Sequence, residues 1–127
     1  MYGQGGTAYV YLCYGIHSLF NVVTNKKDIP HAVLIRAIQP THGIQTILKR
    51  RNMKELKKNV SAGPGTVSDA LGIHYSHTGL SLLGNKIWIE ARGFPVKKSS
   101  ILSTKRIGVD YAGKDAKLLY RFVLKIS

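Results

Sequence analysis

Two runs of aromatic and β-branched residues, joined by a glycine, constrain the fold of this chain most strongly. Residues 9–14 read Tyr-Val-Tyr-Leu-Cys-Tyr, and residues 19–24 read Leu-Phe-Asn-Val-Val-Thr. These residue types favour strands, and Gly15 supplies the turn between them. The pattern therefore predicts a β-hairpin near the start of the chain. Because side chains alternate along a strand, the first two tyrosines share a face, and Tyr14 lies near the tip.

The segment after the hairpin predicts one more strand and two helices. Residues 32–38 are nearly all apolar, which indicates a strand buried on both faces. An i, i+3, i+4 apolar stripe over residues 43–52 predicts a helix, whose Lys49, Arg50 and Arg51 we expect in solvent. A weaker, basic helix is expected over residues 54–60.

The second half of the chain adds strands around one further helix. Thr66, with Asp69 three residues later, resembles the N-cap of a helix. Strands are predicted over residues 86–90, 106–109 and 120–124. Strands dominate, so the sequence predicts a mixed α+β fold, and its 127 residues suit a single domain over positions 1–127.

The charge of the chain favours a polyanionic partner. Nineteen Lys and Arg residues against six Asp and Glu residues give a net charge of +13. Small soluble domains usually carry a net charge of about 2–8. The excess favours nucleic acid first and an anionic membrane second. A soluble domain whose charge serves only solubility is the plain alternative.

Several other classes of site and location find no support in the sequence. A lone cysteine, Cys13, excludes an internal disulfide and fits a reducing compartment. No apolar run reaches the roughly 18–20 residues of a membrane span, and the start lacks the pattern of a secretory signal. The five histidines lack a carboxylate cluster, so we expect no metal and no cofactor. We expect a monomer in a bacterial-type cytoplasm, associated with the nucleoid and without a membrane partner.

The hairpin tip admits two interpretations from its residues alone. A tip tyrosine such as Tyr14 on a basic protein can enter a minor groove and unstack a base step. A second tyrosine behind it can stack on a base that has left the helix. The other interpretation is an aromatic β core with one exposed ring, which pattern alone favours.

Four groups of motifs favour the DNA-binding interpretation over the aromatic core, because together they resemble one family. They are Tyr9–Gly15 with Phe20–Val23, Ala32–Ala37, Gly63–Gly65 with Ala70–Ile73, and Arg106–Gly113 with Tyr120–Phe122. In this order they make almost the whole chain similar to DNA-repair glycosylases of the 3-methyladenine (alkyladenine, methylpurine) type. The resemblance implies a curved, mostly antiparallel sheet, similar to the partial barrel of formyltransferase C-terminal domains, with a protruding hairpin and a few helices.

The resemblance also implies a pocket for a damaged base. Tyr11 matches a ring that stacks on the extruded base. Asn21 matches an asparagine that crowds out a purine with a 2-amino group and so disfavours guanine; a short amide is a plausible steric filter. Leu34 matches a further pocket residue. The implied partner is double-stranded DNA that contains damaged purines.

Other positions match contacts to the DNA itself. Tyr14 matches the tyrosine that enters the minor groove where the damaged nucleotide leaves. We expect Arg51 in the basic face that meets phosphate, and the backbone amides of Gly63 and Gly65 to hold a phosphate before a helix. Thr66 stands where the family often has lysine, so the phosphate contact of that lysine has no match here.

Two positions match groups that hold the attacking water. Arg36 lies among apolar residues, where an unpaired arginine is expensive to bury, so it either reaches the surface or serves a polar site. The matching arginine of the family helps to hold the water, and the main-chain carbonyl at the position of Ile107 also contacts it. Neither group is a base, because arginine stays protonated and a carbonyl only orients.

The general base of the family has no match in this chain. In the family it is a glutamate well upstream of the hairpin, and none of the six acids here has its context. Three explanations are open: the sequence is a fragment, its start lies at an internal methionine, or its gene is a truncated remnant. We expect no substitute base.

The implied reaction is hydrolysis of the N-glycosidic bond of an alkylated or deaminated purine, such as 3-methyladenine or hypoxanthine. A carboxylate beside the sugar stabilises the positive charge and deprotonates the water. The sequence thus leaves three functions open: a base-excision glycosylase, a DNA-binding remnant without catalysis, and a basic RNA-binding module.

Overall fold

The computed structural model describes residues 5–13, 15–24, 31–57, 60–105 and 120–125. Tyr14, Ile107 and the strand expected over 106–109 lie outside the described residues. The chain divides into two compact units, Met1–Ile89 and Glu90–Ser127, each of which is described by itself. The expected single domain over 1–127 therefore stays a prediction.

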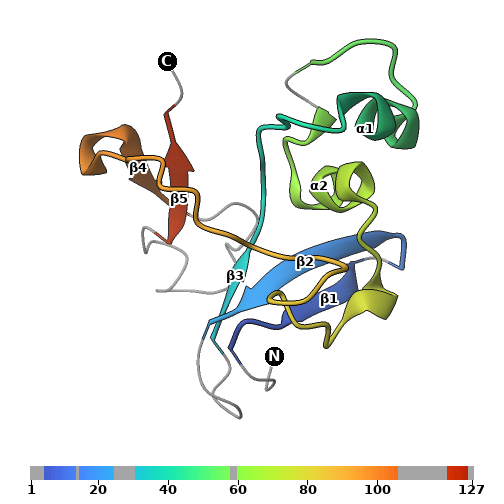
Figure 1. Cartoon of the computed structure of the whole chain (residues 1–127), viewed down its shortest axis with the longest axis horizontal. Helices are drawn as coiled ribbons and strands as arrows, with labels where there is room; N and C mark the ends of the chain where they lie inside the picture. The colour runs from blue at the N-terminus through green and yellow to red at the C-terminus, as the bar shows by residue number, and fades with distance from the viewer. Residues whose placement is uncertain (1–4, 14, 25–30, 58–59, 106–119, 126–127) are drawn as a thin grey trace. The chain divides into compact units, whose positions relative to one another are not determined.

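A three-stranded antiparallel sheet forms the centre of the first unit. Its strands are β1 (Ala8–Cys13), β2 (His17–Val23) and β3 (Ala32–Leu34), in the order β1-β2-β3 (Figure 1). The predicted hairpin is confirmed, with Cys13 opposite His17 at its tip end. The aromatic and β-branched residues thus form the strands that their propensity indicates.

The third strand is shorter and more exposed than the sequence predicts. Beyond Leu34 the chain leaves the regular ladder, although the Ile35 amide still donates to the Phe20 carbonyl. Burial on both faces is wrong, because 52% of Val33 is exposed. The reason is position: β3 is the last strand in the order, and a run of apolar residues does not reveal that it lies at an edge.

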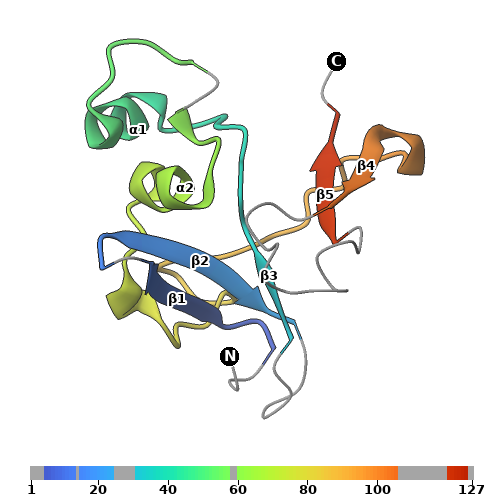
Figure 2. The ribbon, with the colours of Figure 1, turned by 180° about the vertical axis from the view of Figure 1, so that it is seen from behind.

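The two faces of this sheet pack against different parts of the chain. On one face, Ala8, Val10 and Phe20 form a core cluster with Ile73 and Leu82. Helix α2 (Pro64–Leu71) packs against β2, and in both views it lies on the other side of the sheet from the yellow segment after it (Figures 1 and 2). The side chains of β1 and β2 that point away from this cluster therefore lie on the face that α2 covers.

The helix predicted from the apolar stripe over residues 43–52 is confirmed. Helix α1 (Ile44–Arg51) begins after Gly43 and ends at Asn52, with Ile47 and Leu48 buried in a second cluster beside Ala70 of α2. The basic helix expected over 54–60 is wrong for residues 54–57, which are not helical, while Val60 has 3₁₀ conformation. Asn52, in a left-handed conformation, turns the chain out of α1, and Leu56, 48% exposed, offers no buried stripe to a further helix.

The expected N-cap of the second helix is also wrong. Gly63 is the N-cap of α2 and Pro64 its first residue, so Thr66 lies inside the first turn. Proline suits the first helical position, because its fixed φ is already helical and its missing N–H has no partner there. The Thr66 hydroxyl instead donates to the Gly63 carbonyl at 2.9 Å.

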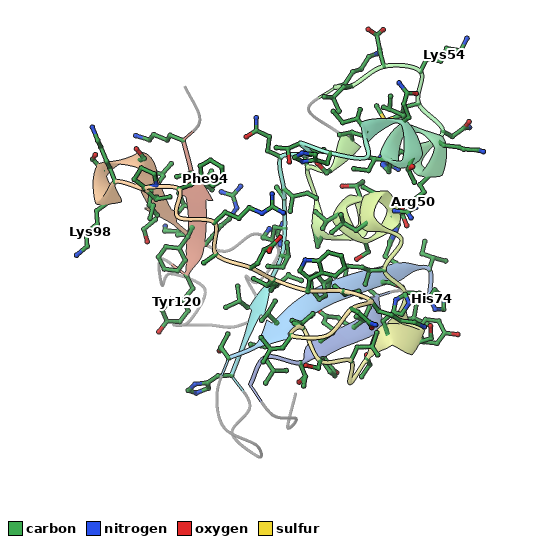
Figure 3. All side chains as sticks on the ribbon, viewed as in Figure 1. Arg50, Lys54, His74, Phe94, Lys98 and Tyr120 are labelled. Atoms are coloured by element: carbon green, nitrogen blue, oxygen red, sulfur yellow. The ribbon has the colours of Figure 1, made fainter. Side chains whose placement is uncertain are left out.

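Of the three basic residues expected in solvent, Lys49 and Arg50 are exposed and Arg51 is half-buried, and both arginines also bond to backbone carbonyls. Arg50 donates to the Ala70 carbonyl at 3.0 Å, at the end of α2, and Figure 3 shows its side chain beside that helix. Arg51 donates to the Val60 carbonyl at 3.0 Å and has only 21% of its side chain exposed. Long guanidinium side chains reach carbonyls at helix ends, which the charge pattern does not indicate.

The later residues add two short 3₁₀ turns and a second sheet. They are η2 (Tyr75–His77) in the first unit, and η3 (Lys98–Ser100), β4 (Ile101–Thr104) and β5 (Arg121–Leu124) in the second. The pairing of β4 with β5 is antiparallel, which confirms the last predicted strand. The strand expected over 86–90 is wrong, since only Trp88 bridges there, to Leu83.

The α+β class is confirmed by these elements. The finer expectation of one curved sheet differs from the described residues, which form a three-stranded and a two-stranded antiparallel sheet.

Candidate functional site

The three expected base-pocket residues lie on one face of the first sheet. In the register of the sheet, Asn21 of β2 is opposite Tyr9 of β1 and Leu34 of β3. Tyr11 is opposite Leu19, two residues from Asn21 on the same face. Ala8 and Val10 of the core cluster point to the opposite face of the sheet. Tyr11, Asn21 and Leu34 are therefore brought together by strand register alone.

The burial of these residues differs in a way that suits a receptor for a planar ligand. Asn21 is 6% exposed, and its side-chain amide donates to the Leu19 carbonyl at 3.3 Å. Tyr11 is 37% exposed, with its ring centroid 5.7 Å from that of Tyr9. A fixed amide thus lies beside a partly open pair of aromatic rings. Such rings offer stacking surface, while the amide offers a steric and polar limit.

An open hollow of about 380 Å³ lies on the same face, toward the hairpin tip. Its lining comes from the ends of β1 and β2, from α1 and from the start of α2. These residues are Cys13, His17, Leu19, Arg51, Gly63, Pro64, Gly65, Thr66 and Asp69. The expected DNA-contact residues Arg51, Gly63 and Gly65 therefore share one hollow.

The start of α2 approaches the hairpin closely at Gly65. A Cβ atom added to Gly65 would lie 3.2 Å from Nδ1 of His17, so the absence of a side chain lets the helix meet the imidazole. Pro64 has no N–H, and the Val67 amide donates to the Gly63 carbonyl at 2.8 Å. The amides of Gly65 and Thr66 belong to the first turn, where a helix gives no acceptor. Amides in this position attract anions.

Arg51 joins α1 to the hollow. Beside its bond to Val60, its guanidinium lies 4.0 Å from the Asp69 carboxylate of α2, which is 58% exposed. An ion pair this exposed contributes little to stability. The hydrogen bond to the Val60 carbonyl fixes the Arg51 side chain, so its charge lies in the lining of the hollow.

Of the two expected water-positioning residues, Arg36 is among the described residues and Ile107 is not. Arg36 follows β3 and is half-buried. In the part of the chain that the structure describes, no hydrogen bond or ion pair joins Arg36 to another residue. An arginine among apolar residues either reaches the surface or serves a polar site.

Sequence reasoning missed three ionisable residues that line the hollow: Cys13, His17 and Asp69. The signal for the first two was available, because strand alternation places positions 13 and 17 on the face of Tyr11. Asp69 was expected only near a helix start. Its place in the hollow depends on the packing of α2 against β2, which no local pattern indicates.

Within the described ranges, no three His, Cys, Asp or Glu side chains gather to hold a metal ion. No helix among those residues has the length and hydropathy to cross a membrane.

Comparison with known proteins identifies the family. The profile of the family described as "Methylpurine-DNA glycosylase (MPG)" matches residues 1–127. The chain belongs to the methylpurine-DNA glycosylase family. This confirms the resemblance on which the pocket residues were chosen, while the roles of those residues stay predictions.

Several curated proteins are similar to this methylpurine-DNA glycosylase family member. Proteins named "Putative 3-methyladenine DNA glycosylase" from Chlamydia felis and Chlamydia abortus are 43% and 44% identical over 128 residues, which is 100% of this chain. A protein of the same name from Alkaliphilus oremlandii is 39% identical over 98% of the chain. The chain spans 64–66% of the length of these relatives.

Proposed function

We propose that this chain recognises damaged purines in duplex DNA as part of a base-excision glycosylase. The damaged base leaves the helix, stacks on Tyr11 and abuts Asn21 and Leu34. The observation that carries the proposal is the common face of these three residues, with the amide of Asn21 opposite Leu34. The net charge of +13 supports a DNA partner.

The proposal assigns the rest of the DNA contact to the hollow and the hairpin tip. The amides of Gly65 and Thr66 and the charge of Arg51 hold a backbone phosphate, and Tyr14 fills the gap left by the extruded nucleotide. Arg36 holds the attacking water and the nucleotide backbone. We also propose a monomer that acts at the nucleoid in the cytoplasm, with one curved, mostly antiparallel sheet.

The reaction proposed for the family member is hydrolysis. The bond between C1′ and the purine nitrogen breaks, water supplies a hydroxyl to C1′, and its proton is passed on, ultimately to the departing base. A carboxylate that deprotonates the water completes this chemistry. The proposed substrate bases are 3-methyladenine and hypoxanthine.

A second candidate is DNA binding without catalysis. The acids among the described residues are Glu55, Asp69 and Glu90, and none belongs to a strand of the first sheet. The strands of the proposed receptor face therefore carry no described carboxylate, and Asp69, in the adjoining hollow, lies 4.0 Å from Arg51. This observation favours recognition over turnover by the chain as it stands.

The test uses the wild-type chain with a duplex that carries one hypoxanthine, the same duplex undamaged, and a structured RNA. Excision above background supports the glycosylase. Preference for the damaged duplex without excision supports the second candidate. Equal affinity for both duplexes, or a preference for RNA, overturns the proposed recognition of a flipped base.

A further inference from the structure

The outer edge of β1 is held by a side chain that belongs to no strand. β1 ends the sheet order, so its outward N–H and C=O groups need partners from elsewhere. Residues after η2 supply them at Ala8: the Ala8 amide donates to the Leu80 carbonyl, and the Gly79 amide to the Ala8 carbonyl, each at 2.8 Å. Among the described residues, backbone pairing on this edge stops there.

Thr78 extends that pairing toward the hairpin tip through its hydroxyl group. The Val10 amide donates to Oγ1 of Thr78 at 2.7 Å, and the same hydroxyl donates to the Val10 carbonyl at 2.6 Å. One side chain thus satisfies both outward groups of a residue that is only 4% exposed. It replaces the bonds that a neighbouring strand residue would make.

Val10 lies between the two tyrosines of the receptor face. Its side chain points into the core cluster, so the rings of Tyr9 and Tyr11 project from the opposite face. Beyond it, Leu12 is 43% exposed and has no described backbone partner on the outer edge. The Thr78 hydroxyl is therefore the last described contact that holds this edge before the hairpin tip.

We infer that Thr78 is a positioning residue for base recognition. Its two hydrogen bonds to Val10 fix the position and twist of β1. The Tyr11 ring is thereby held beside Asn21 at the separation that a stacked base requires. This role rests on the proposed function. Because Thr78 is itself exposed, its side chain can be changed without opening a cavity in the core.

The experiment compares the wild-type chain with Thr78→Val, Thr78→Ser and a control, Thr41→Val. Among the described residues, the Thr41 hydroxyl contacts only its exposed neighbour His42. Two quantities are measured: hydrogen exchange of the Val10 amide together with the ring signals of Tyr11, and the ratio of affinities for hypoxanthine-containing and undamaged duplexes. Thr78→Val is expected to speed Val10 exchange, to shift the Tyr11 signals, and to lower the affinity ratio about fivefold, as expected for loss of one hydrogen bond. Thr78→Ser is expected to restore all three.

The inference is overturned if Thr78→Val leaves Val10 exchange unchanged, or if the wild-type chain prefers the damaged duplex and Thr78→Val leaves that preference unchanged. It is also overturned if affinity for both duplexes falls equally and serine does not restore it, because that pattern marks a merely structural role. If the wild-type chain shows no preference for the damaged duplex, the proposed function fails. Positioning is then decided by the Tyr11 signals: unchanged signals overturn it, and signals that shift in Thr78→Val and return in Thr78→Ser support it.

Discussion

Asn21 of β2 lies directly opposite Leu34 of β3, at the centre of the face that carries Tyr11. The amide is 6% exposed and is held by a bond to the Leu19 carbonyl. A polar group fixed in this way limits which ligand edge can approach it, because displacing it breaks its bond and leaves a buried donor unpaired. The pair therefore defines the selective part of the proposed receptor.

Replacing Asn21 by serine is expected to weaken selection between purines. The shorter side chain leaves room for a 2-amino group, so the preference for a hypoxanthine duplex over one with an unpaired guanine falls about tenfold. Competition binding with the two duplexes measures it. Val22→Ala, on the opposite face of the same strand, is the control and keeps the preference. An unchanged preference in Asn21→Ser argues against a selective amide.

A methyl group at Gly65 is expected to disturb the hollow rather than the fold. The added Cβ lies 3.2 Å from Nδ1 of His17, so the exposed imidazole must move by a few tenths of an ångström. Affinity for damaged and undamaged duplexes alike is expected to fall roughly threefold, as for one weakened hydrogen bond to phosphate. His17 ring signals report the displacement.

Gly63→Ala is the matched control for that change. Gly63 has an extended backbone with φ of 171°, and its added Cβ meets only Thr66 Oγ1 at 3.4 Å, an ordinary contact. We expect unchanged affinity and unchanged His17 signals. Equal losses from both alanine variants would show that crowding of His17 is not the cause.

Gly72→Ala is expected to destabilise the packing of α1 on α2. Gly72 ends α2 with φ of 69°, a conformation that costs a side chain about 1–2 kcal/mol. The new Cβ also lies 3.0 Å from the Arg50 guanidinium carbon, which displaces the bond from Arg50 to Ala70. Urea unfolding measures the loss of free energy of unfolding.

Gly79→Ala separates strain from crowding, since its φ is 92° but nothing lies within 4 Å of the added Cβ. Both glycine variants carry the backbone cost, and only Gly72→Ala disturbs Arg50. In the Gly72→Ala background, Arg50→Ala is therefore expected to cost less than in the wild-type chain. Equal costs of Arg50→Ala in both backgrounds would contradict the contact.

Much of the first unit follows from its sequence because local and tertiary preferences agree there. The hairpin residues favour strands, and the stripe of Ile44, Ile47 and Leu48 marks α1 within one residue of its ends. The basic segment after Asn52 and the run around Trp88 show the limit. Each has residues of the right type, but neither gains the partner surface that stabilises a short helix or strand.

The candidate site was predictable where strand alternation decides it. Tyr11, Asn21 and Leu34 share a face because of register, which the hairpin pattern implies once the turn is placed. The hollow was not predictable in the same way. Arg51 and Asp69 meet there because two helices pack together and a glycine admits His17. Such contacts depend on the distances between elements.

Arg36→Gln is expected to reduce the salt dependence of DNA binding. A guanidinium that contacts the nucleotide backbone releases counterions, so its loss lowers the slope of log affinity against log salt by about 1. Titrations at several salt concentrations measure the slope. Arg92→Gln is the control, since Arg92 pairs with Glu90 at 2.6 Å. Equal slopes for Arg36→Gln and the wild-type chain would rule out a backbone contact.

The most direct test is the affinity of Tyr11→Ala for a hypoxanthine duplex relative to the undamaged duplex. Stacking on one aromatic ring contributes about 1–3 kcal/mol per base, so the ratio of the two affinities is expected to fall at least about fivefold while undamaged binding stays the same. Tyr75→Ala, an exposed ring of η2, is the control and keeps the ratio. If Tyr11→Ala weakens both duplexes equally, or neither, the extruded base does not rest on Tyr11.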